Sequence, residues 1–401
     1  MQVARGGPLH LTYCTNIHAA DGWTAVFENL RRYAPALKRR FSPDAPFGIG
    51  LRLSARDARE LLDGQLDTFK TWLDREGLYV ALINGFPYGA FHGTPVKADV
   101  YAPDWRDDAR VAYTLDLIAI LSRLLPGGID GGVSTAPLSY KTWLPAGDEA
   151  AWAAVVANVV RVAAALVDAK RVHGADIHLD IEPEPDCTIE NTDETIAFFR
   201  DRLLPIGAPM LARTLGIDEG SARAYLLDRI RVCFDCCHFA VEFEDPIAAL
   251  DRLTSAGLKI GRIQLSSALR VPLDSDPTRT QGAVNRLRPF ADATYLHQVV
   301  ARRDDALEHF PDLGEAIASC HGHCGSEWRI HFHVPLFTRE YDGFTSTQDD
   351  VRTVLAAAKA SRFTRHLEIE TYTWDVLPGG LKIDLLESIG REYDWVLSVL
   401  R

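Results

Sequence analysis

Polar and apolar residues alternate without interruption in the segment 177–183. In an extended chain this spacing places His178, Asp180 and Glu182 on one side and aliphatic residues on the other. A buried carboxylate without a partner is very costly, so three ionisable groups on one buried side need partners. Two kinds of partner are open: a divalent metal ion shared by several carboxylates, or a structural network of ion pairs. We favour the metal.

Similar polar residues occur at the ends of three later apolar runs. Asp235 ends one run and is followed by His238 three residues further on, Gln264 lies in the next run, and Glu370 ends the last. Carboxylate and amide oxygens are suitable ligands for hard or borderline divalent cations. We expect Glu182, Asp235, Gln264 and Glu370 to bind one divalent metal ion, with Mn, Mg, Co and Zn all open.

Eight short apolar runs are predicted to be strands, and segments with helical periodicity separate them. The predicted strands span 9–14, 48–53, 79–84, 132–137, 177–183, 231–235, 262–265 and 366–370. A strand–helix alternation repeated eight times predicts an α/β protein with a parallel sheet, which most simply closes into one (β/α)8 TIM barrel domain over 1–401. The C-terminal strand ends, and with them the four expected ligands, would meet at one mouth of this barrel.

Start signals place several of the connecting helices. Helical periodicity runs over 107–125, Ser54 precedes a predicted helix over 55–76, and Asn191 begins another helix with Glu194 three residues on.

Two stretches interrupt the strand–helix alternation. The segment 84–104 is rich in Gly and Pro and is predicted to be a long ordered loop after the third strand. The segments 294–302 and 328–337 are predicted to be extra strands between strands seven and eight, where they would form an extra hairpin. Long connections after the strands are where such barrels carry function.

Composition and charge exclude some classes of function. The chain has 401 residues and a formal net charge of −12. Because such an acidic surface repels polyphosphates, no nucleic-acid partner is expected. No apolar run approaches the roughly 18 residues of a membrane span, so no span is expected. The seven cysteines are an odd number and include the adjacent Cys236 and Cys237, which indicates buried thiols and a cytoplasmic location.

The segment 320–324 reads Cys-His-Gly-His-Cys and contains residue types that bind zinc. Four ligands within five residues can hardly all reach one tetrahedral ion. We therefore predict a small turn with free thiols here.

The series Glu182, Asp235 with His238, Gln264 and Glu370 resembles the metal site of the xylose-isomerase-like TIM barrels. That superfamily includes sugar isomerases, epimerases and the endonuclease IV enzymes. The resemblance implies a site in which Glu, Asp, His and Glu from successive strands bind one divalent metal. Gln264 stands where the superfamily usually has His, and its amide oxygen can still act as a ligand.

A closer similarity, to the EboE family, covers nearly the full length of the chain. It rests on the segments 11–18, 46–54, 84–93, 295–299 and 331–336. EboE proteins are the TIM-barrel members of the bacterial ebo gene clusters, which are associated with trafficking of secondary-metabolite precursors towards the cell envelope. The similarity implies a small metabolite as partner, sugar-like or phosphorylated, together with other proteins of the cluster.

Histidines provide further candidate site residues. His331 and His333 alternate, so both imidazoles face one side of the chain, and they are similar in place to an Asp-x-His pair that binds a further zinc in the endonuclease branch. His92 stands where superfamily members often place a substrate or metal histidine. We predict that His92, His238, His331 and His333 bind the substrate, and a second metal at His331 and His333 is the alternative.

Three functions remain open. The first is a metal-dependent isomerase or epimerase, in which Glu182 and Glu370 exchange a carbon-bound proton of a metal-bound substrate. The second is a phosphoester hydrolase of the endonuclease IV type with several metal ions, and the third is a non-catalytic metabolite carrier. One ion per chain favours the first, and two or three favour the second.

Overall fold

The computed structural model describes residues 1–401 except 4–8, 91–96, 292–293, 322–323, 362 and 376–383. An eight-stranded parallel sheet forms its centre, and its strands are those that the apolar runs predict. They are β1 His10–Tyr13, β2 Phe47–Arg52, β3 Leu78–Asn84, β4 Gly131–Thr135, β5 Ile177–Ile181, β6 Ile230–Asp235, β7 Ile260–Leu265 and β14 His366–Ile369.

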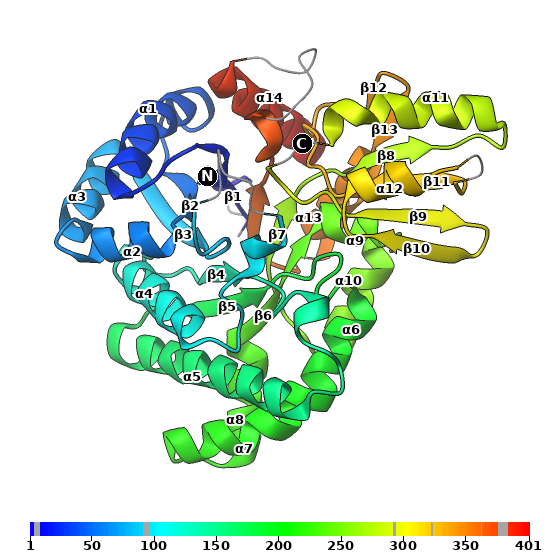
Figure 1. Ribbon diagram of the computed structural model, residues 1–401. Coiled ribbons are helices and arrows are strands. Elements are labelled where there is room, and N and C mark those ends of the chain that lie inside the picture. The colour runs from blue at the N-terminus through cyan, green and yellow to red at the C-terminus, as the bar shows by residue number, and fades with distance from the viewer. Residues whose placement is uncertain (4–8, 91–96, 292–293, 322–323, 362, 376–383) are drawn as a thin grey trace.

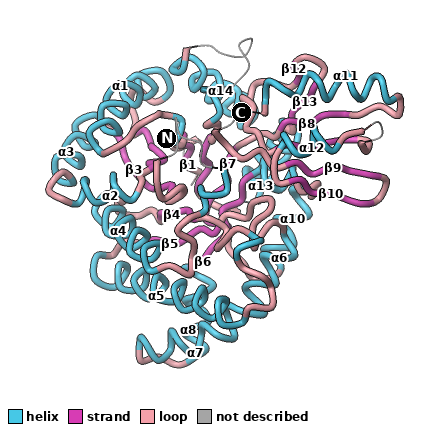
Figure 2. The backbone as a smooth tube through the Cα atoms, in the orientation of Figure 1, coloured by secondary structure: helices cyan, strands magenta, loops and turns pink. Residues whose placement is uncertain are grey.

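The parallel sheet is closed. Its strand order is β1-β14-β7-β6-β5-β4-β3-β2. Each barrel strand therefore lies beside the barrel strand that comes before or after it in the sequence. A parallel bridge between Cys14 and Gly50 joins the edge strands β1 and β2, and the backbone N–H of Arg52 donates to the Thr15 hydroxyl at 2.8 Å. The magenta strands in the centre of Figure 2 are surrounded by helices. The predicted (β/α)8 barrel is confirmed.

Most of the α-helices surround the barrel, as Figure 1 shows. They are α1 Trp23–Phe41, α2 Ala55–Leu62, α3 Leu66–Glu76, α4 Asp108–Leu124, α5 Glu149–His173, α6 Thr192–Ala197, α7 Leu204–Leu215, α8 Glu219–Arg229, α9 Cys236–Val241, α10 Pro246–Ser255, α11 Pro277–Leu287, α12 Leu313–Ser319, α13 Gln348–Ser361 and α14 Leu385–Leu400. Shorter turns are η1 Thr15–Ile17, η2 Lys97–Tyr101, η3 Lys141–Trp143, η4 Phe198–Leu203, η5 Arg288–Phe290 and η6 Thr373–Asp375.

The helix start signals hold, but one predicted helix is divided. The side chains of Ser54 and Asn191 accept backbone N–H groups of the first turn of α2 and α6, as predicted. The predicted helix over 55–76 is interrupted between α2 and α3, where Gly64 has a φ of 87°. A left-handed residue cannot continue a right-handed helix, so the chain turns at this glycine.

A second, six-stranded sheet is inserted between β7 and β14 and lies to one side of the barrel in Figure 1. Its strands are β8 Leu269–Pro272, β9 Val299–Arg303, β10 Ala306–Phe310, β11 Glu327–Ile330, β12 Glu340–Tyr341 and β13 Phe344–Ser346. The two predicted extra strands correspond to β9 and β11, which pair antiparallel. After β11 the chain returns to the barrel, where the N–H of Val334 donates to the carbonyl of Ser267 at 2.9 Å.

A buried ion network fills the middle of the barrel. Arg262 on β7 is fully buried, with its Nε 3.0 Å from Oδ2 of Asp180 and its Nη1 3.1 Å from Oε2 of Glu368. Its Nη2 donates to the carbonyls of Ile83 and Gly132. The structural ion-pair network is therefore the correct interpretation for Asp180.

The prediction of free thiols at 320–324 is wrong. Cys320 and Cys324 form a disulfide, with their Cα atoms 5.4 Å apart. This Cα separation is in the usual range for a disulfide.

Helix α5 is long and apolar enough, by length and composition alone, to cross a membrane, although a few charged and polar residues interrupt its apolar run. However, 56% of its apolar window is buried inside the protein, where it contacts α4, α7 and β5. An apolar helix packed in this way is the core helix of a barrel.

Candidate metal centre at the barrel mouth

Three carboxylates meet at the C-terminal mouth of the barrel. Glu182 follows β5, Asp235 ends β6 and Glu370 follows β14, so parallel strands deliver all three side chains to the same end. Each is at most 4% exposed. Glu182 and Glu370 line a partly open pocket of about 530 Å³, a volume that includes space open to solvent.

The three carboxyl groups act on one another. Burial and the neighbouring Asp235 raise the pKa of Glu182 well above its usual value. Burial, Glu182 and Asp235 likewise raise the pKa of Glu370, whose carboxyl lies within hydrogen-bonding reach of Asp235. Burial also acts to raise the pKa of Asp235, but His238, His333 and the Ser266 hydroxyl outweigh it and hold that pKa low. The cluster therefore either keeps protons or takes up a cation.

Asp235 is held by the chain that follows it. Its side chain caps the N-terminus of α9. Its Oδ1 accepts hydrogen bonds from the backbone N–H groups of Cys237 and His238, at 2.7 and 3.1 Å, and from the Ser266 hydroxyl at 2.7 Å. Its Oδ2 accepts no N–H or hydroxyl group of the described residues, and the nearby Glu370 carboxyl can donate to Asp235 only while it holds a proton. One oxygen is thus fixed for position, and the other remains for a ligand.

Glu370 is oriented by two amides from distant strands. Asn16 in η1 and Asn84 at the end of β3 donate to its Oε1 at 2.8 and 3.1 Å. Within the described part of the chain, Oε2 of Glu182 has no partner. Buried oxygens without donors, next to one another and on fixed supports, fit a divalent cation.

In the sheet register Gln264 is level with Asp235 and lies two residues deeper in the barrel than Glu370. It is fully buried and pairs with Asp235 and Glu368 in the sheet register. Its Oε1 accepts the thiol of Cys233 at 2.9 Å, and it is not among the pocket-lining residues. Ser266, two residues further along the chain, donates its hydroxyl to Asp235 at 2.7 Å. A ligand role for Gln264 stays a prediction.

Three predicted histidines gather beside the carboxylates. Nδ1 of His238 hydrogen-bonds the carbonyl of Pro183 at 2.9 Å, Nδ1 of His331 hydrogen-bonds Oε1 of Gln298 at 2.8 Å, and Nδ1 of His333 hydrogen-bonds a backbone carbonyl at 2.8 Å. Because each Nδ1 faces an oxygen that accepts a hydrogen bond, the proton of each neutral ring is on Nδ1. Each Nε2 then has a lone pair that can bind a metal ion. This arrangement is typical of imidazoles that bind metals.

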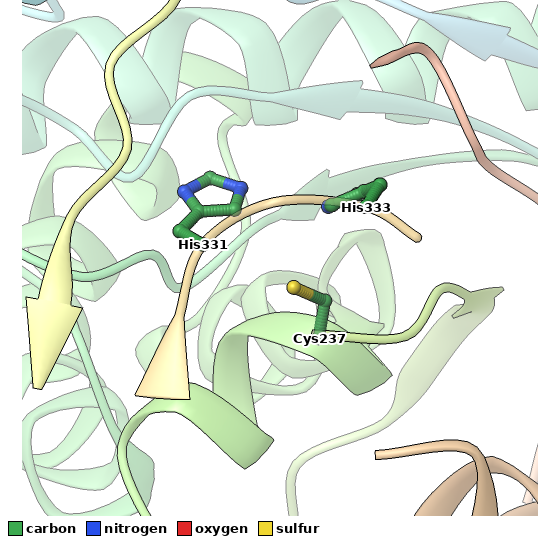
Figure 3. A group of neighbouring side chains, drawn as sticks. All are labelled: Cys237, His331 and His333. Carbon is green, nitrogen blue, oxygen red and sulfur yellow. The ribbon is translucent and has the colours of Figure 1, made fainter. Parts of the chain in front are cut away.

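The imidazoles can share ions with their neighbours. Burial lowers the pKa of His331 well below its usual value and that of His333 to about 4, so both rings are neutral at pH 7. Three groups have potential ligand atoms within 4.8 Å of one another: Asp235 with His238 and His333, Glu184 with His238 and His331, and Cys237 with His331 and His333. Figure 3 shows the last group, in which the sulfur of Cys237 points towards the two imidazoles.

Some site residues were not anticipated. Asn16, Asn84, Glu184 and Cys237 all take part, and their signal was a polar residue at or just after a strand end. Tyr101 donates to Oε1 of Glu184 at 2.6 Å, which orients this carboxylate. The fourth predicted histidine, residue 92, lies outside the described residues.

The pocket wall combines aromatic and polar groups. Phe86, Tyr101, Tyr295 and Tyr372 line it together with Lys97, whose ammonium group is 2.7 Å from Asp312. Such a wall offers a bound molecule both apolar contacts and hydrogen-bonding groups.

Comparison with family models and with curated proteins gave no match. Solved structures do match. An IolI protein with bound zinc is 13% identical, with 98% of each chain covered and a TM-score of 0.47. A xylose isomerase-like TIM barrel protein from Mycobacterium smegmatis in complex with magnesium is 15% identical, with 98% of this chain and 96% of that chain covered and a TM-score of 0.48. A D-tagatose 3-epimerase-like protein is 10% identical, with 98% of each chain covered and a TM-score of 0.48.

Proposed function

We propose that this protein is a divalent-metal-dependent enzyme of the isomerase or epimerase type that acts on a small, sugar-like metabolite. One observation carries the proposal: the carboxylates of Glu182, Asp235 and Glu370 lie together at the mouth. Their mutual repulsion and their burial raise the pKa of both glutamates. One oxygen of Glu182 and one of Asp235 accept no hydrogen bond from an N–H or hydroxyl group of the described residues. A shared cation would satisfy all three.

When bound there, a divalent metal would polarise a substrate oxygen and acidify the neighbouring carbon-bound proton. Glu182 and Glu370 reach the pocket from β5 and β14, which β6 and β7 separate in the sheet. Carboxyls on separate strands can remove a proton on one face of a substrate and return one on the other. Burial and the neighbouring carboxylates raise the pKa of both glutamates, so each holds a proton more readily than an exposed glutamate does.

Asn16 and Asn84 support this role for Glu370. Both donate to Oε1, so the plane of the carboxyl group is fixed and Oε2 is the atom left to exchange a proton. Tyr101, Phe86 and Tyr372 restrict the pocket and limit the access of water.

A second candidate is a phosphoester hydrolase with several metal ions. The observation that favours it is the set of three imidazoles, His238, His331 and His333, each with its Nδ1 hydrogen-bonded to an oxygen and its Nε2 available. With the carboxylates alongside, the mouth has enough ligands for more than one ion.

The biological setting is also part of the proposal. Membership of the EboE family, and a role beside other ebo-cluster proteins on a trafficked secondary metabolite, rest on the sequence similarity. A cytoplasmic location rests on the buried free thiols alone, since the Cys320–Cys324 disulfide does not support it. Five cysteines are free and buried: Cys14, Cys187, Cys233, Cys236 and Cys237. A metabolite carrier is the remaining alternative, although a carrier has no need of paired acid–base carboxylates.

Exchange of a carbon-bound proton with solvent tests the proposed reaction. Metal-loaded protein is incubated in D₂O with candidate sugars and hydroxy-ketone metabolites, and deuterium incorporation is followed by NMR. We expect deuterium at one carbon, and loss of exchange in Glu370→Gln but not in the control Glu340→Gln, whose side chain is exposed. Release of inorganic phosphate would instead support the hydrolase, and tight binding without exchange would support the carrier.

The number of bound metal ions separates the two enzyme candidates. Metal-stripped protein is titrated with Mn²⁺ or Zn²⁺, and bound metal is counted by atomic emission spectrometry. Loss of one ion per chain in Asp235→Asn relative to wild type supports the isomerase, and loss of two or more supports the hydrolase.

A further inference from the structure

A second set of metal-binding residues lies at the opposite, N-terminal end of the barrel. His178 is near the start of β5, His366 begins β14, and Asp130 immediately precedes β4. Their potential ligand atoms lie within 4.8 Å of one another. The proposed reaction uses none of these residues.

The geometry points to a structural zinc-type site formed by Asp130, His178 and His366. Two imidazoles and one carboxylate are a common ligand set for Zn²⁺, Co²⁺ and related ions, with one position left for water. β6 and β7 separate β14 from β5 in the barrel, so an ion here would tie β14 to β4 and β5, with which it shares no hydrogen bonds.

His178 is prepared for this role. Its Nδ1 donates to Oδ1 of Asp180, which is itself held by the guanidinium of Arg262 at 3.0 Å. The proton is therefore on Nδ1, and the buried Nε2 has no hydrogen-bond partner in the described structure and lies 3.8 Å from Oδ2 of Asp130. A carboxylate behind the ring is the usual support of a metal-bound histidine.

Asp130 and His366 complete the set. Nε2 of His366 is 3.3 Å from Oδ1 of Asp130, while its Nδ1 has no hydrogen-bond partner among the residues described. On binding an ion through Nε2, His366 would carry its proton on Nδ1 instead. Arg231 pairs with Oδ2 of Asp130 at 3.0 Å, which leaves Oδ1 for the ion.

The site can be reached from solvent. The side chain of Asp130 is 18% exposed, whereas the two imidazoles are essentially inaccessible. An ion would enter past Asp130 and be enclosed by the strands. The bottom of such a barrel usually serves stability rather than catalysis, so we expect the ion to stabilise the fold.

Zinc content and thermal stability of the full-length protein test the site in solution. Metal-stripped wild type, His366→Gln, His333→Gln and the double variant are dialysed against ZnCl₂. The control is His173→Gln, an exposed residue at the end of α5. We expect His366→Gln to lose one zinc equivalent relative to the control and to lose part of the zinc-induced rise in Tm. We expect the double variant to lose the sum of both single losses. A folded His366→Gln that binds as much zinc as the control would overturn the proposal.

Crystals of the wild type answer the same question without a variant. After soaking in ZnCl₂, an anomalous difference map at the zinc edge should show a peak about 2 Å from Nε2 of both His178 and His366. A peak at the mouth alone would refute the second site and leave the proposed function intact. A peak at the N-terminal end alone would do the reverse.

Discussion

Nε2 of His238 lies 3.1 Å from Nε2 of His331. Nδ1 of His238 faces the carbonyl of Pro183, and Nδ1 of His331 faces Oε1 of Gln298, whose Nε2 donates to the carbonyl of Pro185. Since carbonyl oxygens only accept, both Nδ1 atoms carry the proton and the two Nε2 lone pairs face each other. An extra proton or a metal ion removes this repulsion, and burial disfavours the proton.

Gln298→Leu should weaken zinc binding at the mouth by about 10- to 100-fold, because it removes the acceptor that fixes the tautomer of His331. Zinc affinity is measured by competition with a chromogenic chelator. The control is Gln281→Leu, an exposed residue of α11. Equal affinities in the two variants would show that His331 binds no zinc.

Asp235→Asn should reduce metal affinity at the mouth by at least about tenfold, because a neutral amide attracts a cation far less than a carboxylate does. Cys320→Ser removes the disulfide to Cys324 and should change the affinity little. Isothermal titration with Mn²⁺ compares the two. Equal losses would move the metal site to the cysteine segment.

Gly261→Ala should destabilise the protein by at least about 1–3 kcal/mol, the range for overpacked cores. A Cβ at this position would lie 1.8 Å from Oδ1 of Asp180, inside the ion network of Arg262. The matched control is Gly282→Ala in α11, where the nearest atom would be 3.9 Å away and a stabilisation of up to about 1 kcal/mol is expected. Urea unfolding measures both, and similar stabilities would contradict the tight packing at Gly261.

Glu392→Gln should remove part of the pH dependence of stability. Glu392 is 1% exposed, and burial raises its pKa to about 7 from 4.5, although Thr371 donates to its Oε1 at 2.6 Å. The folded state therefore holds the proton more tightly than the unfolded state. Stability falls as the pH rises from about 4.5 to about 7, by roughly 3 kcal/mol from this group.

Urea unfolding at pH 5 and pH 8 measures this change for wild type, Glu392→Gln and Glu340→Gln, the last an exposed control. Glu392→Gln should lose less stability than the control between the two pH values. If both lose the same amount, folding does not raise the pKa of Glu392, and its carboxyl is already ionised in the folded protein at pH 5.

Much of the fold could be predicted because each strand leaves a local signal. All eight predicted barrel strands occur, with small shifts at their ends, since an apolar run between helical segments has few other structures available. The end of a predicted helix was harder to place: Gly64 interrupts the segment after Ser54. The inserted sheet was underestimated for a similar reason, because β12 and β13 are too short to show a periodic pattern.

By itself, the sequence determined that inward-facing acids lie on the barrel strands, because a period of two assigns side chains to a face. Only the tertiary structure decided how deep each one lies. Asp180 and Glu182 are two residues apart and lie on the same face of the strand. The guanidinium of Arg262 pairs with Asp180, whereas Glu182 lines the pocket. The tertiary structure also brought Asn16 to Glu370 across 354 residues of chain. Depth and partners depend on strand register and barrel closure, which are set by contacts between distant segments and leave no local pattern in the sequence.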